Sequence, residues 1–379
     1  MRAHRTWVEI NSHALATNVT SLKALLSPSA RFCAVVKANA YGHGLKEVTT
    51  ILTREGVDAF AVDHIDDALL LREWYPTALI LVLGYTMFDR FEEALRQDIQ
   101  ILLYDKEGIE QAQRVGAECA RPFSVHLKVE TGTYRQGILM EDLPDIIRLI
   151  QRSSMIRVGG VSTHFANIED SQNPEFATRQ FMHFQQCLTL FGEGGVQPTF
   201  AHCACSAAII LYPQTHLSLV RAGISLYGLW SSELVQTTVR NQGFTCDLRP
   251  VLSWKTRIAQ VKPISMGTPI GYGLSETMKR SGRIAVLPVG YWDGYSRLLS
   301  SVGEVLIKGT RCKILGRICM NMMMVDVSEV SSAKKEDEVT LLGIDGHQRI
   351  SAEDLAQKSQ TIHYEVVTKI NPHLPRVVT

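Results

Sequence analysis

The first 230 residues alternate short apolar runs with amphipathic stretches, and no other feature of the sequence constrains the fold as strongly. The eight runs are rich in Val, Ile and Leu, and several are apolar on both faces, as buried parallel strands are. They span residues 32–38, 59–63, 78–84, 99–105, 123–129, 158–165, 199–206 and 219–228. Eight strand–helix units over about 220 residues predict a (β/α)8 TIM barrel, because a doubly wound open sheet usually has fewer strands.

The pattern changes after Trp230, where long helical stretches become rare. Runs that alternate or carry β-branched residues, separated by glycine and proline turns, predict a mainly β second domain. They span residues 252–264, 283–291, 304–315, 322–328 and 337–343. We therefore expect an α/β protein with a barrel over residues 1–235 and a β domain over residues 236–379. The first residues of the chain are candidates to join the β domain. Residues 231–250 are the expected connection, and 352–370 the site of a short helix followed by an extended piece.

Charge and cysteine usage exclude several classes of protein. The 39 Lys and Arg nearly cancel the 38 Asp and Glu, which argues against a nucleic-acid or anionic-membrane partner. The first 19 residues have no apolar core of a secretory signal, and no run reaches the roughly 20 apolar residues of a membrane span. Eight scattered cysteines lack the two-residue gap of zinc ribbons, so we expect reduced thiols, no metal and a cytoplasmic location.

Polar residues follow the predicted strands at the ends where (β/α)8 barrels place their active sites. Lys37 follows the first strand, and a lysine desolvated at such a position can react as a neutral amine to form a Schiff base. The other candidates at the same mouth are Lys128, Arg135, His164, His202, Ser206, Arg221 and Gly223.

Residues 34–44, AVVKANAYGHG, closely resemble the pyridoxal phosphate lysine motif of alanine racemases. Further motifs of that family follow in the same order, and the resemblance runs from Trp7 nearly to Arg376. They are THFA (163–166), HCACSAA (202–208), RAGISLYG (221–228), GYG (271–273), LPVGYWDGYSR (287–297), GRICMN (316–321) and HYE (363–365).

The resemblance implies pyridoxal 5'-phosphate as the cofactor, held covalently by Lys37. It also implies that Arg221 faces the pyridine nitrogen, that His202 orients Arg221, and that His164 lies behind the second base. Because a guanidinium cannot accept a proton, it leaves that nitrogen unprotonated. By the same resemblance the phosphate is held by Tyr41, Ser206, Tyr364 and the backbone N–H groups of Gly223 and Ile224.

The resemblance further implies a two-base racemisation of L- and D-alanine, an isomerase reaction that supplies D-alanine for peptidoglycan. Lys37 serves one face of the substrate and Tyr272 the other. In the family this tyrosine enters the barrel mouth of the other subunit, so a homodimer with shared active sites is expected. Arg135 lies near the phenolic oxygen of the cofactor and the substrate carboxylate, and the backbone N–H of Met320 contacts that carboxylate. Lys128 matches a lysine that is carbamylated in some members, where the carbamate orients the arginine.

Three positions depart from the family pattern. Tyr134 stands where the loop before Arg135 usually has a glycine, so a positive φ there would be costly and we expect an altered loop path. Cys205 replaces a usual asparagine, and Asn321 replaces a usual aspartate. Tyr364 agrees with alanine racemases rather than with serine racemases, where this residue tends to be smaller and polar.

Three alternatives stay open beside alanine racemisation. A racemase of another small amino acid, such as serine, would use the same residues. A barrel-type pyridoxal phosphate decarboxylase of basic amino acids relies on an acidic residue at the pyridine nitrogen, so Arg221 and Tyr272 argue against it. A non-catalytic pyridoxal phosphate carrier resembles the barrel alone, and about 130 residues beyond the barrel argue against it.

Overall fold

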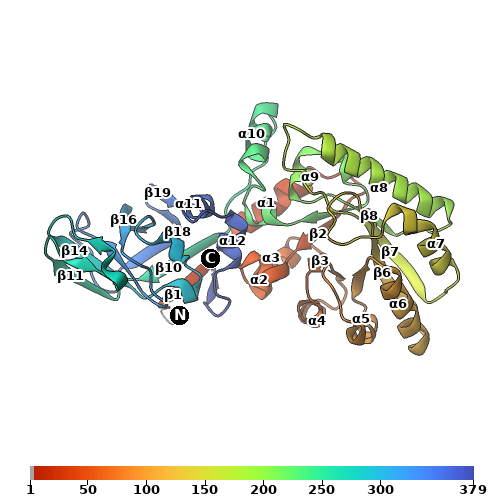
Figure 1. Ribbon diagram of the computed structural model, residues 1–379, viewed down its shortest axis with the longest axis horizontal. Coiled ribbons are helices and arrows are strands. Elements are labelled where there is room, and N and C mark those ends of the chain that lie inside the picture. The colour runs from red at the N-terminus through yellow and green to blue at the C-terminus, as the bar shows by residue number, and fades with distance from the viewer. Residues whose placement is uncertain (1–3) are drawn as a thin grey trace. The chain divides into compact units, whose positions relative to one another are not determined.

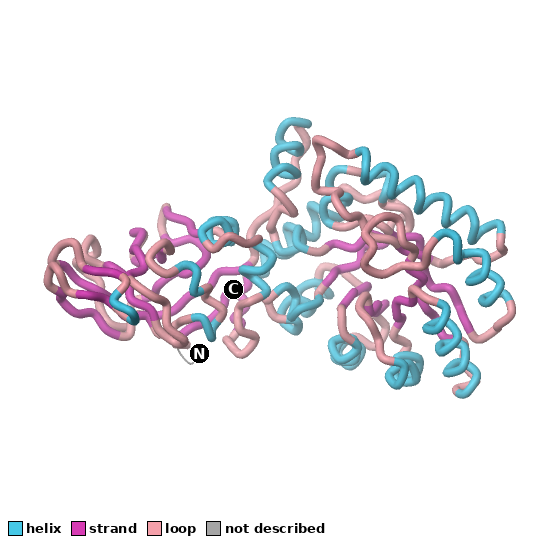
Figure 2. Tube along the Cα trace, viewed as in Figure 1, coloured by secondary structure: helices cyan, strands magenta, loops and turns pink. Residues whose placement is uncertain are grey.

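The computed structural model describes residues 4–379 in two compact units (Figures 1 and 2). The barrel unit comprises Ala14–Ala38 and Thr50–Pro250. The β unit comprises the described residues up to His13, together with Asn39–Thr49 and Val251–Thr379. The expected division into 1–235 and 236–379 stays a prediction. In the structure the barrel unit runs on to Pro250, and a short internal segment, Asn39–Thr49, groups with the β unit.

Eight parallel strands form the sheet of the barrel unit, which confirms the predicted (β/α)8 architecture. Their order is β8-β7-β6-β5-β4-β3-β2-β9, so strands that are consecutive along the chain lie side by side. The sheet closes on itself through two backbone hydrogen bonds, from Ser218 N to Ala201 O and from Arg221 N to Ala204 O, at 3.3 and 3.0 Å. The strands are β2 (Arg31–Val35), β3 (Ala59–Val62), β4 (Leu79–Val82), β5 (Gln100–Leu103), β6 (Phe123–Lys128), β7 (Ile156–Ser162), β8 (Phe200–His202) and β9 (Leu219–Ala222).

Helices surround the outer side of these strands (Figure 1). Helix α6 shows why they form: Asp105 caps it by accepting a hydrogen bond from Gly108 N at 2.8 Å, and the buried Ile109, Ala112 and Val115 recur at helical spacing. The helices that lie wholly or partly in this unit, apart from the short turn after Lys37, are α1 (Ser12–Lys23), α3 (Leu45–Arg54), α4 (Ile65–Trp74), α5 (Phe91–Arg96), α6 (Lys106–Glu118), α7 (Leu143–Gln151), α8 (Glu175–Glu193), α9 (Ser206–Leu211) and α10 (Glu233–Gln242). Helix α10 lies in the expected connection, which is therefore partly helical.

The β unit is built on one large sheet, as the alternating runs predicted (Figure 2). Its strand order is β11-β14-β17-β16-β15-β18-β10-β1-β20, with β19 paired to β18. Strand β1 pairs antiparallel with β10 and parallel with β20, which brings both ends of the described chain into this sheet. The strands are β1 (Thr6–Ile10), β10 (Leu252–Arg257), β11 (Gln260–Ile264), β14 (Gly282–Leu287), β15 (Glu304–Ile307), β16 (Thr310–Leu315), β17 (Met323–Asp326), β18 (Glu338–Asp345), β19 (Gln348–Ile350) and β20 (Arg376–Val378), with a separate hairpin of β12 (Pro269–Ile270) and β13 (Glu276–Thr277).

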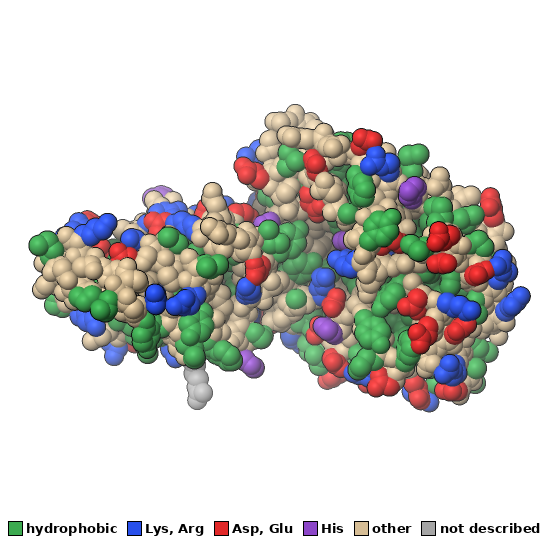
Figure 3. Space-filling view, in the orientation of Figure 1, with side chains coloured by type: hydrophobic (Ala, Val, Ile, Leu, Met, Phe, Trp, Pro, Cys, Tyr) green, Lys and Arg blue, Asp and Glu red, His purple; other side chains and the backbone are tan. Residues whose placement is uncertain are grey.

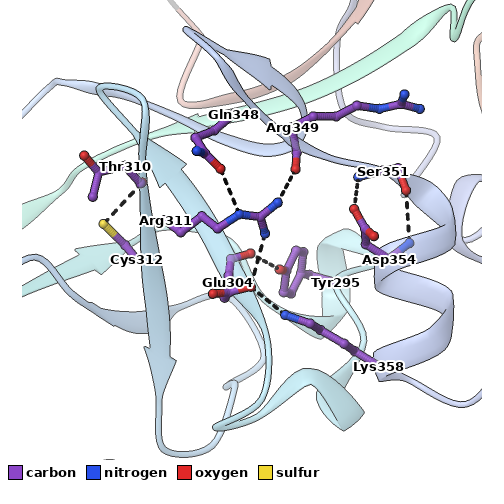
Figure 4. Close-up of polar contacts among 10 residues, drawn as sticks. All are labelled: Tyr295, Glu304, Thr310, Arg311, Cys312, Gln348, Arg349, Ser351, Asp354 and Lys358. Carbon is purple, nitrogen blue, oxygen red and sulfur yellow. Dashed lines mark hydrogen bonds and ion pairs between the residues drawn. The ribbon is translucent and has the colours of Figure 1, made fainter.

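Residues 352–370 form two helices, α11 (Ala352–Lys358) and α12 (His363–Thr368), so the expected extended piece is wrong. Glu365 favours the second helix, which contains two valines. It lies in the first turn, where the helix dipole favours a carboxylate, and it pairs with Lys369 one turn later. Helix α11 begins with a capping box in which Ser351 and Asp354 bond to each other's backbone N–H groups (Figure 4).

Helix α11 is fastened to the sheet by a cluster of charges around Glu304 of β15 (Figure 4). The Glu304 carboxylate accepts hydrogen bonds from Lys358 at 2.6 Å and from Arg311 at 3.2 Å. Arg311 also donates to Gln348 Oε1 at 3.0 Å and to Arg349 O. The hydrogen bond from Lys358 is the largest cause that holds the pKa of Glu304 below its usual value, and Arg311 contributes less. This network links α11 to β15, β16 and β19.

The surface agrees with the near-zero net charge. On the face that Figure 3 shows, acidic and basic side chains are mixed over each unit, with no large area of one sign. All eight cysteines are free thiols, as expected. Within residues 4–379, no helix has both the length and the apolar character needed to cross a membrane.

Candidate active site at the barrel mouth

Four cationic side chains converge at the carboxyl ends of the barrel strands. Lys37 follows β2, Lys128 is the last residue of β6, and Arg221 lies within β9 rather than at its start. Burial lowers the pKa of His164 well below its ordinary value, and the charges of Arg221, Arg135, Lys128 and Lys37 lower it further, in that order. Residues as far apart in the sequence as Lys37 and Arg221 thus share one electrostatic environment. The predicted mouth is strongly positive.

Lys37 begins a turn of unusual backbone geometry, α2 (Lys37–Tyr41), which α3 (Leu45–Arg54) follows. The four residues from Ala38 to Tyr41 have φ values of 52–54°, so the turn is left-handed. Such a conformation costs roughly 1–2 kcal/mol per non-glycine residue, so tertiary contacts must compensate. Asn39 contributes by accepting a hydrogen bond from Leu45 N at 2.8 Å. A Cβ on Gly42 would lie 2.0 Å from Val367 O, so only glycine fits there.

The Arg221 guanidinium is buried, and both of its Nη atoms donate hydrogen bonds. Its Nη atoms donate to Nδ1 of His202 and to the backbone oxygens of His202, Thr163 and Cys203, the last three at 3.0, 2.8 and 3.3 Å. A longer contact of 3.4 Å reaches His164 Nδ1. Within residues 4–379 its Nε–H donates to no acceptor, so one donor is left for a ligand. The predicted pairing of Arg221 with His202 is present.

Two further side chains continue from His202 and were not predicted from the sequence. His126 Nδ1 lies 2.7 Å from His202 Nε2, and His126 Nε2 lies 2.8 Å from Gln100 Oε1. The sequence did contain a signal for His126: it stands two residues before Lys128, and strand residues at that spacing point to the same face.

Gln180 of α8 is a second buried group that was not predicted. It donates to His164 O at 3.3 Å and accepts from Ala166 N at 2.9 Å.

A niche rich in N–H donors lies where the phosphate is expected. Ser206 Oγ accepts hydrogen bonds from Gly223 N at 3.0 Å and Ser225 N at 3.2 Å. The intervening Ile224 N–H donates to no acceptor within the described chain. A hydroxyl beside backbone N–H groups at the start of a short helix is a favourable environment for an anion.

The loop before Arg135 accommodates its aromatic residue at an energetic cost. Tyr134 has φ +50°, the left-handed region that glycine would occupy without strain, and its side chain is 84% exposed. The Glu130 carboxylate stabilises the loop by accepting from Gly132 N at 2.6 Å and Thr133 N at 2.7 Å. Arg135 itself is exposed. Tyr134 therefore keeps the positive φ that a glycine would have at this position, but at an energetic cost.

The remaining expected residues belong to the β unit. The rings of Tyr41 and Tyr364 lie side by side, with centroids 6.3 Å apart. Tyr272 and Met320 line one open groove of about 960 Å³, together with Asn321. Tyr272 is 72% exposed and Met320 55% exposed, so both are accessible on this unit.

The barrel is closed, and its mouth carries a lysine, further cationic side chains and an anion niche. A β unit with an exposed tyrosine follows it in the chain. This combination is typical of a two-domain enzyme that binds a cofactor. Two family models match the chain: Alanine racemase, N-terminal domain, over residues 10–231, and Alanine racemase, C-terminal domain, over residues 251–378. The chain belongs to the alanine racemase family. It is accordingly a racemase, an isomerase, in a family that depends on pyridoxal phosphate.

Relatives match along their whole length. An alanine racemase of Methanococcus maripaludis is 38% identical over 378 residues, which cover 100% of this chain and 99% of that protein. The solved alanine racemase of Clostridium difficile 630 has a TM-score of 0.93 at 33% identity, with 100% of this chain and 97% of that chain covered. A solved histidine racemase of Leuconostoc mesenteroides has a TM-score of 0.89 at 27% identity, with 100% and 99% covered.

Proposed function

We propose that this chain interconverts L-alanine and D-alanine with pyridoxal 5'-phosphate, using Lys37 and Tyr272 as the two bases. The observation that carries the proposal is the convergence of Lys37, Lys128, Arg135 and Arg221 on His164 at one barrel mouth. Such a concentration of positive charge suits a phosphorylated cofactor and a substrate carboxylate.

The residues at the mouth fit this cofactor. The Ser206 hydroxyl and the N–H group of Ile224 would hold the phosphate. The Gly223 N–H, which here donates to Ser206 Oγ, and the Tyr41 and Tyr364 hydroxyls would be further donors. The unused Nε–H of Arg221 would donate to the pyridine nitrogen and leave it unprotonated, because a guanidinium cannot accept a proton. His202 would orient that guanidinium. When bound, the cofactor supplies the electron sink that acidifies the substrate's α-proton.

Two bases on opposite faces explain racemisation without movement of the substrate. Lys37 Nζ would remove or return the α-proton on the D-face, and the Tyr272 hydroxyl would do so on the L-face. The Tyr272 anion needs stabilisation, since an ordinary tyrosine pKa is near 10. His164 and Arg221 would provide the hydrogen-bonded chain behind it.

We infer that the active enzyme is a homodimer in which each barrel mouth receives Tyr272 and Met320 of the partner. The exposure of both residues in one groove of the β unit supports this. The backbone N–H of Met320 and the Arg135 guanidinium would bind the substrate carboxylate. A carbamate on Lys128 would orient Arg135. The enzyme would work in the cytoplasm, where D-alanine for peptidoglycan is made.

Alanine is favoured as substrate by Tyr364, while serine is the main alternative. The similarity to a histidine racemase makes a direct substrate test necessary. The purified enzyme should show the visible absorption of bound cofactor and form D-alanine from L-alanine faster than D-serine from L-serine or D-histidine from L-histidine. Bound cofactor without D-alanine formation would overturn the substrate assignment and leave the cofactor assignment intact.

Two variants test the proposed bases. Lys37→Ala should lose the covalent attachment of the cofactor, seen by mass spectrometry after borohydride reduction. Tyr272→Phe should keep the attachment but lose turnover of L-alanine by a hundredfold or more, in line with the roughly 10²–10⁴-fold contribution of a general base. Covalent labelling of Lys37→Ala, or unchanged turnover by Tyr272→Phe, would contradict the respective role.

A further inference from the structure

Behind Arg221 lies a hydrogen-bonded chain that enters the barrel interior. Arg221 Nη1 faces His202 Nδ1, His202 Nε2 faces His126 Nδ1, and His126 Nε2 faces Gln100 Oε1. His126 and His202 are both completely buried, and their rings meet edge to face with centroids 4.9 Å apart. No carboxylate takes part in these contacts, so the chain is made of a permanent cation, two imidazoles and an amide.

The cationic end determines the direction of every hydrogen bond in the chain. Arg221 only donates, so His202 Nδ1 must carry a lone pair. A neutral His202 then has its proton on Nε2 and donates to His126 Nδ1. His126 in turn has its proton on Nε2 and donates to Gln100 Oε1, an acceptor. The reverse direction would place an Nδ1–H of His202 against an N–H of Arg221, which leaves two buried donors facing each other.

Both histidines must be uncharged for this arrangement to hold. Burial, followed by the charge of Arg221, lowers the pKa of His126 to about 3 and that of His202 well below its ordinary value. Protonation of either ring would convert its acceptor nitrogen into a donor and break the chain at that point. The environment therefore selects one protonation state of each imidazole.

Two adjacent glycines in β7 make room for the inner part of the chain. A Cβ on Gly159 would lie 2.5 Å from Gln100 Oε1, and a Cβ on Gly160 would lie 2.4 Å from His126 Nδ1. Neither glycine has a positive φ, so close approach rather than backbone conformation explains them. Glycine weakens a strand interior, yet here two of them occupy a buried barrel strand. The space they leave is filled by Gln100 and His126.

We propose that Gln100 and His126 are positioning residues of the racemase site, which act by holding His202 in its Nε2–H tautomer and so fix the Arg221 guanidinium. The functional part of this inference rests on the proposed role of Arg221 at the cofactor ring. Gln100 supplies the terminal acceptor, His126 transmits the direction, and His202 presents its lone pair to Arg221. Loss of that lone pair would release Nη1 from one of its two acceptors and let the guanidinium rotate.

The tautomer can be measured directly on the unaltered protein. With ¹⁵N-labelled histidine, the ring nitrogens of His202 and His126 should each show a protonated Nε2 and an unprotonated Nδ1, with no titration between pH 6 and 9. The measurement uses both the holoenzyme and the cofactor-free protein, so it does not depend on racemase activity. A protonated Nδ1 on His202 would overturn the proposal.

A matched pair of variants tests the functional consequence. His126→Asn places its Oδ1 at the position of the imidazole Nδ1 and keeps an acceptor for His202, whereas His126→Leu has the same branching without one. We expect His126→Leu to lose the single His202 tautomer and to lower kcat for L-alanine about tenfold or more, with little change in KM. His126→Asn should recover most of both. Equal kcat and equal His202 spectra in the two variants would refute a role for the acceptor.

Gln100→Leu tests the end of the chain. Gln100→Leu should leave His126 in a mixture of tautomers and lower kcat less than His126→Leu does. An unchanged His126 spectrum and an unchanged kcat would remove Gln100 from the proposal.

If His126→Leu does not fold, the spectrum of the unaltered protein still decides the tautomer. If the unaltered holoenzyme racemises no amino acid while His202 shows the expected tautomer, the proposed function fails and the hydrogen-bonded chain stands.

Discussion

At the scale of single residues, the site contains side chains in conformations and protonation states that their residue types alone do not favour. Tyr134 has φ +50° although it is a bulky aromatic residue, and four residues after Lys37 are likewise left-handed. Lys128 is 6% exposed, and burial, followed by the charges of Arg135 and Arg221, lowers its pKa to about 8. Strain and desolvation of this kind are concentrated where ligands are expected.

Replacing Tyr134 by glycine should stabilise the protein. A left-handed backbone costs a non-glycine residue about 1–2 kcal/mol, and the greater freedom of glycine in the unfolded chain offsets part of the gain. We expect Tyr134→Gly to raise the free energy of urea unfolding by about 1 kcal/mol. Tyr134→Ala is the control, because it removes the exposed ring and keeps the strain. If both variants have the same stability, strain at this residue is not the cause.

Lys128 should take up carbon dioxide. Carbamylation requires the uncharged amine, which is about a tenth of the population at pH 7 when the pKa is about 8, against about 0.03% for an ordinary lysine. In ¹³C-bicarbonate we expect a carbamate signal by NMR at pH 8. The signal should weaken as the pH falls toward 6, because protonation removes the reactive amine. Lys128→Met should lack it, and its absence from the unaltered protein at pH 8 would contradict the assignment.

At the scale of elements, helix ends explain local features that residue identity alone leaves open. Helix α9 begins after Cys205, whose thiol makes no capping hydrogen bond, although Ser206 at its first position contributes to the anion niche. By contrast, Ser351 and Ser232 cap α11 and α10 by accepting from backbone N–H groups. The helix next to the candidate phosphate site therefore lacks the side-chain cap that an asparagine at position 205 could supply.

Restoring the cap should strengthen α9. In Cys205→Asn, the amide oxygen can accept from the N–H groups of the first turn, and such caps contribute about 0.5–2 kcal/mol. We expect an increase of about 1 kcal/mol in the free energy of unfolding of the cofactor-free protein. Cys205→Ala, which cannot cap, should stay within about 0.5 kcal/mol of the unaltered protein. An asparagine variant no more stable than the alanine variant would rule out a capping effect.

At the scale of the whole molecule, the two proposed bases lie in different units of one chain, and Tyr272 is largely exposed on the β unit. If Tyr272 is a base, a second subunit that covers it would explain its exposure. Symmetric dimers place the same pair of surfaces together twice, which creates two equivalent shared sites.

Mixing two inactive variants tests this sharing. Lys37→Ala and Tyr272→Phe should each be inactive alone. After subunit exchange, each mixed dimer has one site with both bases intact and one with neither, so about a quarter of the sites should become active. D-alanine formation by the mixture measures this, with each unmixed variant as control. If the mixture stays inactive although mixed dimers are detected by mass spectrometry, both bases of a site come from the same chain.

The sequence by itself determined the architecture and the candidate mouth residues. Apolar runs at regular intervals allow few arrangements other than a barrel, because each buried strand must be covered by the helix that follows it. Only the tertiary structure decided the left-handed turn after Lys37, the pairing of β1 with β10 and β20, and the helical form of residues 363–368. It also revealed the contacts of Gln100 and His126 behind His202, since hydrogen-bond partners so far apart in the chain meet only when β5, β6 and β8 assemble into one sheet. Local periodicity carries the first kind of information, and long-range register and burial carry the second.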